Sequence, residues 1–196
     1  AMQRGKIEIV PRGWDHADWV GPYYPPDLPR AWRLSYFANE FPGVLVPADV
    51  WPNVASEAMA GWARDVLDRF HIYLELPDAG EARDLRRASA LLSDSLAGLV
   101  LGAGRPPPAA GELPLYRAAG TLGRSVLGRV GDQAAGLATE IQDFPGVDLR
   151  AARSWLEALV RASPASSPLL VIVGGQPPEL ALLRTLTELV RLAGLG

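Results

Sequence analysis

Cysteine is absent from this 196-residue chain, and its absence removes three kinds of chemistry at once. Without a thiol there are no disulfides, no thiolate nucleophile and no sulfur ligand for a metal, while the redox compartment stays undetermined. Basic residues are also few, since 19 Lys and Arg stand against 22 Asp and Glu and leave a net charge of −3. This balance provides no positive field for a phosphate backbone, so we expect no nucleic-acid partner.

The sequence also lacks an apolar run long enough for a membrane span or a signal peptide. We therefore expect no membrane partner and a cytoplasmic location. Ala1, ahead of Met2, is expected to be a tag remnant, and residues 1–5 a tail. With 48% hydrophobic and 21% charged residues, the chain has the composition of a globular protein. Its length predicts one domain over 1–196, shorter than the roughly 250 residues of an eight-fold barrel.

Apolar runs of strand length alternate with segments of helical periodicity. The predicted strands are 6–10, 43–50, 69–76, 98–101, 136–142 and 168–173. The predicted helices are 30–41, 54–67, 81–96, 148–162 and 179–193. Such alternation is typical of an α/β fold with a parallel sheet and right-handed crossovers, either a barrel or an open sheet.

Two internal stretches carry weaker signals. Residues 102–113 contain three consecutive prolines among small residues, so we expect an exposed, mobile connector. From 114 to 135 four glycines interrupt a helix-compatible pattern, and the choice between helix and irregular structure stays open. A sheet of about six strands would not close into a barrel and would leave a gap between its two edge strands. We expect residues 114–135 to cover this gap as a helix, or a second copy of the chain to cover it in a homodimer.

The N-terminal third places uncommon residues at a distinctive spacing. They are Gly13-Trp14, Trp19, Gly21, Tyr24-Pro25, Leu28-Pro29, Tyr36, Phe41 and Trp62. Over residues 6–77 this pattern resembles the opening of the domain-of-unknown-function-72 family, and the last two predicted elements are similar in order to the family's closing units. Members of that family are similar to TIM barrels. The resemblance therefore implies a shortened TIM-barrel-like fold, a reduced barrel or open curved sheet of about six strands with outer helices, for a family whose activity is not settled.

The chain departs from the family pattern at its polar positions. These are hydroxyl positions of the first strand, a Glu and an Asn of the second, a Lys late in the third and a closing Asn pair. The corresponding residues here are Pro11, Arg12, Leu45, Pro47, Glu75, Gly174 and Gly175. A site that needs the family's groups cannot operate unchanged, so the resemblance implies a degenerate member.

Strand ends gather at one face of a parallel barrel, so they form the candidate site. Strand parity places Asp49 with Leu45, and Glu75 with His71. If both sets face the interior, Asp49 and Glu75 meet near the mouth with His16. We predict these three as catalytic candidates, the carboxylates as acid and base and His16 as proton carrier. Solvated loop residues, structural ion pairs and a core position for His71 are the alternatives.

A second group is predicted to bind a ligand by stacking, apolar contact or hydrogen bonding. It comprises Trp14, Asp15, Trp19, Tyr24, Trp51, Tyr73 and Gln176. The alternative for its aromatic members is packing across the barrel mouth and over the first helix. The Asp, Glu and His spacing matches no metal motif, so neither a metal nor a cofactor is predicted.

Two functions follow as hypotheses. The first is a non-catalytic binding or protein-interaction role, with a protein partner, a second copy or a small-molecule ligand. The second is a hydrolase acting on a phosphorylated or sugar-like small molecule through carboxylates at the barrel mouth. Whether the chain is an enzyme is left open, with the replaced polar positions favouring the non-catalytic role.

Overall fold

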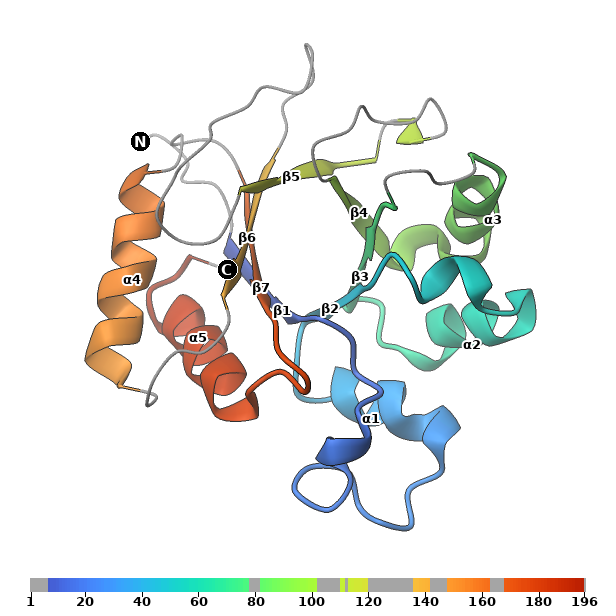
Figure 1. Cartoon of the computed structure of the whole chain (residues 1–196), viewed down its shortest axis with the longest axis horizontal. Coiled ribbons are helices and arrows are strands. Elements are labelled where there is room, and N and C mark those ends of the chain that lie inside the picture. The colour runs from blue at the N-terminus through green and yellow to red at the C-terminus, as the bar shows by residue number, and fades with distance from the viewer. Residues whose placement is uncertain are drawn as a thin grey trace.

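In the residues that the structure describes, seven parallel strands form one sheet that curves into a nearly closed barrel with helices outside it (Figure 1). The computed structural model describes residues 7–77, 82–101, 110–111, 113–119, 136–141, 148–162 and 168–195. The strands are β1 (Ile7–Pro11), β2 (Gly43–Val46), β3 (His71–Glu75), β4 (Leu96–Leu101), β5 (Leu115–Ala119), β6 (Gly136–Ile141) and β7 (Leu169–Val173). Their order, β1-β7-β6-β5-β4-β3-β2, brings the first and second strands to the two ends of the sheet.

The two ends of the sheet meet where β1 and β2 finish. Arg12 forms a parallel bridge with Leu45, and the backbone N–H of Gly13 donates to the carbonyl of Leu45 at 2.8 Å. Gly13 has a φ of +78°, a left-handed conformation that favours glycine at this turn. The barrel is therefore drawn together at the C-terminal ends of its strands.

The barrel interior is a packed layer of side chains. Its members alternate along the strands, as the two-residue period of a strand requires. They are Val10, Leu45, Tyr73, Val100, Tyr116, Ala138, Leu170 and Ile172. Because these residues fill the centre, a ligand has access only to the two ends of the barrel.

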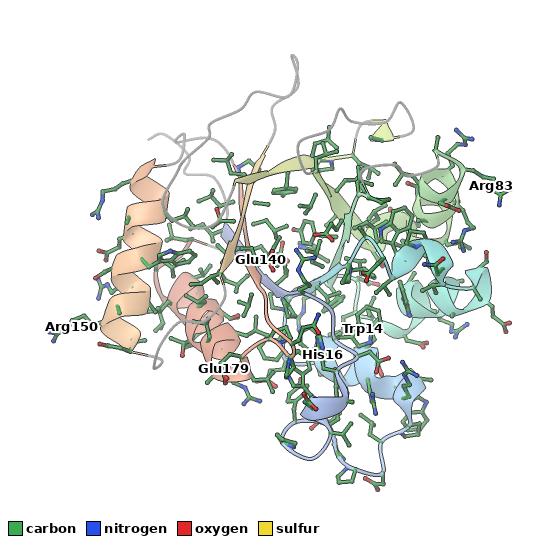
Figure 2. The ribbon with its side chains drawn as sticks, in the orientation of Figure 1. Trp14, His16, Arg83, Glu140, Arg150 and Glu179 are labelled. Atoms are coloured by element: carbon green, nitrogen blue, oxygen red, sulfur yellow. The ribbon has the colours of Figure 1, made fainter. Side chains whose placement is uncertain are left out.

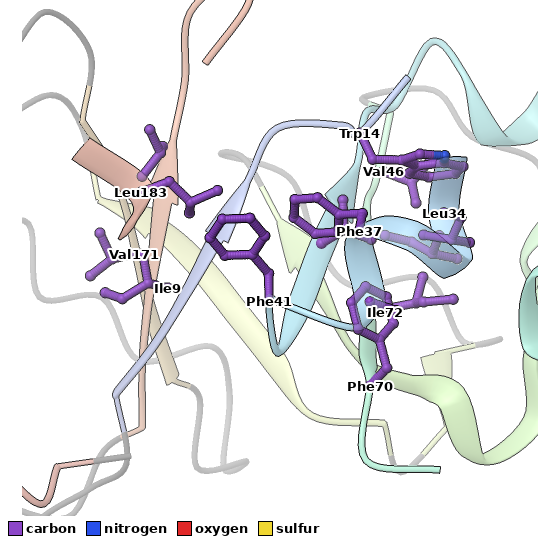
Figure 3. Close-up of a cluster of buried hydrophobic side chains, with 14 of the residues drawn as sticks. Ile9, Trp14, Leu34, Phe37, Phe41, Val46, Phe70, Ile72, Val171 and Leu183 are labelled. Atoms are coloured by element: carbon purple, nitrogen blue, oxygen red, sulfur yellow. The ribbon is translucent and has the colours of Figure 1, made fainter. Parts of the chain in front are cut away.

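The described part of the chain has five α-helices, which cover the outside of the sheet (Figure 1). They are α1 (Arg33–Ala38), α2 (Ser56–Asp65), α3 (Ala82–Leu92), α4 (Leu149–Ala162) and α5 (Leu180–Leu192). Around α1, Phe37 stacks on Phe41 with ring centroids 4.7 Å apart and meets Phe70 edge-on at 6.2 Å (Figure 3). On α5, Leu183 lies in the same apolar cluster as Ile9 of β1. The helices thus bury apolar faces against strands that are apolar on both sides.

The predicted α/β barrel-like fold is confirmed, and the described residues form seven strands where about six were expected. The seventh strand is β5, within the stretch for which helix and irregular structure were the alternatives. It pairs in parallel with both β4 and β6. Its sequence, Leu-Tyr-Arg-Ala-Ala, does not by itself predict a strand, and the hydrogen bonds to these two neighbours stabilise the extended conformation. The predicted second strand is also too long, because it ends at Val46, before Pro47.

The structure describes only part of the predicted connector, residues 102–113. Residues 102–109 and 112 lie outside the described residues, as do 120–135 of the following stretch. Ala110 is only 4% exposed, so exposure is wrong at that residue. Within the described part of the chain, no helix has the length and apolar character needed to cross a membrane.

Candidate functional site at the barrel mouth

Three charged side chains meet across the C-terminal end of the barrel. Arg12 donates from Nε and Nη2 to the two carboxylate oxygens of Glu140, each at 2.9 Å, and from Nη1 to Glu75 at 2.6 Å. The other Glu75 oxygen accepts from the backbone N–H of Ala48 at 3.1 Å. We call Arg12, Glu75 and Glu140 the mouth cluster. One guanidinium thus connects segments that are 63 and 128 residues away in sequence.

The strands determine why these residues meet. Arg12 follows β1, Glu75 ends β3 and Glu140 lies one residue before the end of β6. Each has the parity of an interior residue of its strand, Val10, Tyr73 and Ala138 respectively. Figure 2 shows Glu140 near the middle of the ring of strands, whereas Arg83 and Arg150 lie on outer helices. The mouth cluster is therefore the top layer of the barrel interior.

The mouth cluster is about three-quarters buried, with side chains of Arg12, Glu75 and Glu140 that are 25%, 27% and 26% exposed. Burial opposes the charge on Arg12, but the hydrogen bonds from Glu140 and Glu75 outweigh it and raise the pKa of Arg12. With one positive and two negative groups, the cluster has a formal charge of −1. Bidentate pairing to Glu140 also fixes the plane of the guanidinium.

A hollow of about 700 Å³ lies at this end of the barrel and is lined by two members of the mouth cluster, Arg12 and Glu75. Its walls come from the loops after β1, β2 and β7 together with Glu75. The lining residues include Arg12, Asp15, His16, Asp18, Asp49, Glu75 and Gln176. All three predicted catalytic residues, Asp49, Glu75 and His16, therefore line one hollow, as do the predicted ligand residues Asp15 and Gln176.

His16 is held on the wall of the hollow by two contacts. Its Nε2 lies 3.1 Å from the carbonyl oxygen of Arg12, and its ring packs edge-on against Trp19 with centroids 4.6 Å apart. A carbonyl only accepts, so Nε2 carries the proton and Nδ1 of the neutral ring is an acceptor. Burial lowers the pKa of His16 below its ordinary 6.5. At neutral pH this histidine therefore lines the hollow as a neutral ring rather than as a positive charge.

The two aspartates of the prediction have different surroundings. Asp15 accepts from Arg30 at 2.7 Å and from Arg33 at 2.6 Å, so it is a structural ion pair of the kind given as the alternative. Asp49 lies beyond the end of β2 and is exposed, which makes the parity expected for it wrong because the strand has already ended. It nevertheless lines the hollow.

The predicted aromatic ligand residues lie inside the protein packing. Trp14, Trp19, Tyr24, Trp51 and Tyr73 are between 0% and 8% exposed. The indole N–H of Trp19 donates to the carbonyl of Pro178 at 3.2 Å, and that of Trp51 to the carbonyl of Glu75 at 2.7 Å. The Tyr24 hydroxyl donates to the carbonyl of Trp14 at 2.6 Å. These aromatics thus have the packing role given as the alternative, and they anchor the loops that form the hollow.

His71, expected in the core if not in the site, is at the other end of the barrel. Its side chain is 46% exposed, and its Nδ1 lies 2.9 Å from the carboxylate of Glu8. A core position for His71 is therefore wrong, because the strand β3 begins at this residue and places it at the N-terminal rim.

Sequence reasoning missed Glu140 and did not assign a role to Arg12. Glu140 lies in a predicted strand two residues after Ala138, so its parity was readable, but nothing local placed that strand opposite the first. Arg12 was noted only because it stands where the family pattern has a hydroxyl side chain. Among the described residues, no group of three or more His, Asp or Glu side chains is arranged to hold a metal ion.

Comparisons with known proteins agree with this architecture. Residues 10–103 match the model of the family described as protein of unknown function DUF72. A DUF72 family protein of Thermotoga maritima superimposes with a TM-score of 0.65 at 10% identity, over 95% of this chain and 99% of that one. Two structures of a DUF72 family protein of Enterococcus faecalis are also similar, each at 8% identity. The first has a TM-score of 0.61 over 94% of this chain and 95% of that one. The second has a TM-score of 0.58 over 99% of this chain and 100% of that one. No curated protein matches the chain.

Proposed function

Since this chain is a member of the DUF72 family, whose description names no activity, we propose a function from its barrel mouth: it binds a small, neutral or cationic molecule rich in hydrogen-bond donors, such as a sugar or an amino sugar, without transforming it. The observation that carries the proposal is the mouth cluster, in which Arg12 is committed to Glu75 and Glu140. The sequence predictions of a binding role and of a sugar-like ligand are combined in it.

The charges at the mouth favour donors over anions. Arg12 has a carboxylate on each side, so its positive charge is already matched within the protein. Asp18 and Asp49 add exposed carboxylates to the hollow, whereas the cations Arg30 and Arg33 are paired with Asp15. A phosphate entering here would meet an excess of negative charge. Of the two predicted substrate classes, we therefore propose the sugar-like molecule and not the phosphorylated one.

The acceptors at the mouth are suited to hydroxyl and amino groups. Each oxygen of Glu75 accepts one hydrogen bond from the protein, and a carboxylate has about four acceptor positions in all. The exposed carboxylate of Asp49 supplies further acceptors on the same hollow, which the neutral ring of His16 also lines. A ligand with several O–H or N–H groups can thus satisfy acceptors from the end of β3 and from the loop after β2.

The same mouth cluster argues for binding without reaction. A general acid needs a transferable proton, and both carboxylates of the mouth cluster accept from a guanidinium that holds its protons. Two of the positions that depart from the family pattern, Arg12 and Glu75, are joined to each other by the 2.6 Å bond. Arg12 stands at a hydroxyl position of the family pattern and Glu75 at a Lys position, and here the two side chains form an ion pair with each other. Such pairing supports a role in structure and ligand recognition.

Calorimetric titration with glucose, glucosamine and glucose 6-phosphate tests the proposal at low ionic strength. We expect glucosamine to bind at least as tightly as glucose, and glucose 6-phosphate more weakly than both. Glu75→Gln should weaken glucosamine binding, while the matched variant Glu157→Gln on the outer helix α4 should not change it. Preferential binding of the phosphate ester, or identical binding by Glu75→Gln, would show that the proposed ligand chemistry is wrong.

A hydrolase is the second candidate, because glycoside hydrolysis uses a pair of carboxylates and two predicted catalytic carboxylates, Asp49 and Glu75, line the same hollow. Incubation with p-nitrophenyl glycosides separates the two functions. The binding role predicts no release of nitrophenolate above the buffer rate. Turnover that disappears in Asp49→Asn or Glu75→Gln, with the fold intact by circular dichroism, would favour the enzyme.

A further inference from the structure

The opposite end of the barrel carries a second hollow, unrelated to the mouth. A groove of about 560 Å³ runs beside the N-terminal ends of β1 and β3 and reaches the last turns of α5. It lies at the end of the seam between β1 and β2 that the bridge of Arg12 and Leu45 does not close. Its volume falls in the range of small-molecule sites, roughly 300–1,000 Å³.

The walls of this groove are apolar. Ile9, Phe41, Phe70 and Val190 contribute to its lining and are 2%, 3%, 1% and 5% exposed. All four belong to one buried apolar cluster, and Figure 3 labels the first three. A ligand with a hydrocarbon body would lie against the few atoms of these side chains that are still exposed, so its apolar contact is small.

The polar group deep in the groove is already bonded within the protein. The carboxylate of Glu8 lies 2.9 Å from Nδ1 of His71 and accepts from the hydroxyl of Tyr73. Its side chain is only 18% exposed. A second anion would be repelled at this depth, so a charged ligand head belongs at the rim and its apolar body inside.

The rim of the groove is positive. Arg69 and Arg191 both line it, whereas the acidic rim residue Glu40 is paired with Arg184 at 2.7 Å. Arg191 contacts Glu188 on the same helix, but these side chains are 68% and 53% exposed, and such a pair contributes little. An incoming carboxylate therefore meets two exposed arginines among the lining residues.

We propose that this groove is a binding site for a small amphiphilic monocarboxylate. The carboxylate pairs with Arg69 and Arg191 at the rim, and an unbranched or aromatic body of a few carbon atoms lies along Phe41, Phe70 and Val190. The site is independent of the proposed sugar-like ligand, because a packed barrel interior separates the two ends.

Methyl NMR with octanoate, kept below its micelle concentration, tests the site directly. We expect the methyl signals of Ile9 and Val190 to shift on titration, and that of Val50 at the mouth to stay unchanged. Octanol, which has the same chain without the charge, should shift the same methyls with weaker affinity. Arg69→Gln should weaken octanoate by about 2- to 5-fold and leave octanol unchanged, as expected for an exposed ion pair.

Controls make each outcome decisive. Arg69 and Arg191 are exposed, so the double variant Arg69→Gln/Arg191→Gln should remain folded and weaken octanoate by about 5- to 20-fold. Arg153→Gln, on the outer face of α4, should bind octanoate like the unmodified chain. The proposal is overturned if octanoate shifts Val50 instead of Val190, if octanol binds as tightly as octanoate, or if saturating octanoate shifts none of these methyls.

Discussion

Removal of the guanidinium from the mouth cluster is the sharpest test of the structure. In Arg12→Met the side chain keeps most of its apolar stem, but Glu75 and Glu140 lose their shared partner. Breaking a fully buried ion pair costs about 3–5 kcal/mol, and breaking an exposed one about 0–1 kcal/mol. With side chains 25–27% exposed, an intermediate loss of about 2–3 kcal/mol in the free energy of unfolding is expected.

Urea denaturation at pH 7.5 and calorimetry measure this loss. For a chain of this size the melting temperature should fall by about 2–4 °C for each kcal/mol, or about 4–12 °C in total. The triple variant Arg12→Met/Glu75→Gln/Glu140→Gln should recover most of the loss, because amides carry no unpaired charge. Arg153→Met removes an exposed pair with Glu157 and serves as the control, with a loss of about 0.5 kcal/mol or less. If Arg12→Met is as stable as this control, the mouth cluster does not stabilise the barrel.

Three further predictions concern packing, pH and assembly. Trp19→Ala should destabilise the protein by about 3–5 kcal/mol because Trp19 is 2% exposed, whereas Trp32→Ala, at a residue 62% exposed, should change the melting temperature little. The lowered pKa of His16 means that the unfolded chain binds its proton more tightly, so stability should fall as the pH drops from 7.5 through the ordinary pKa of 6.5. His16→Asn should flatten that part of the stability profile measured by urea denaturation, and an unchanged profile would assign the loss to other groups. The homodimer stays a prediction, to be tested by light scattering at two concentrations: a single monomeric mass at both would contradict it.

The sequence by itself determined the local elements and the class of fold. Strand and helix periods are local properties, so β1, β3, β7 and the outer helices were placed to within a few residues. The spacing of Gly13, Trp14, Trp19 and Tyr24 resembled one family strongly enough to imply the barrel-like fold. The ends of parallel strands must gather at one face, and this rule was sufficient to bring Asp49, Glu75 and His16 to one hollow.

Only the tertiary structure decided which side chains make the site. Arg12 and Glu140 are 128 residues apart, and they meet because β7 pairs with both β1 and β6 and aligns the ends of these strands. β5 is a strand because it has a neighbour on each side, a condition that no local window contains. Register and closure are properties of the whole sheet, and they determine which charges face each other across the barrel mouth.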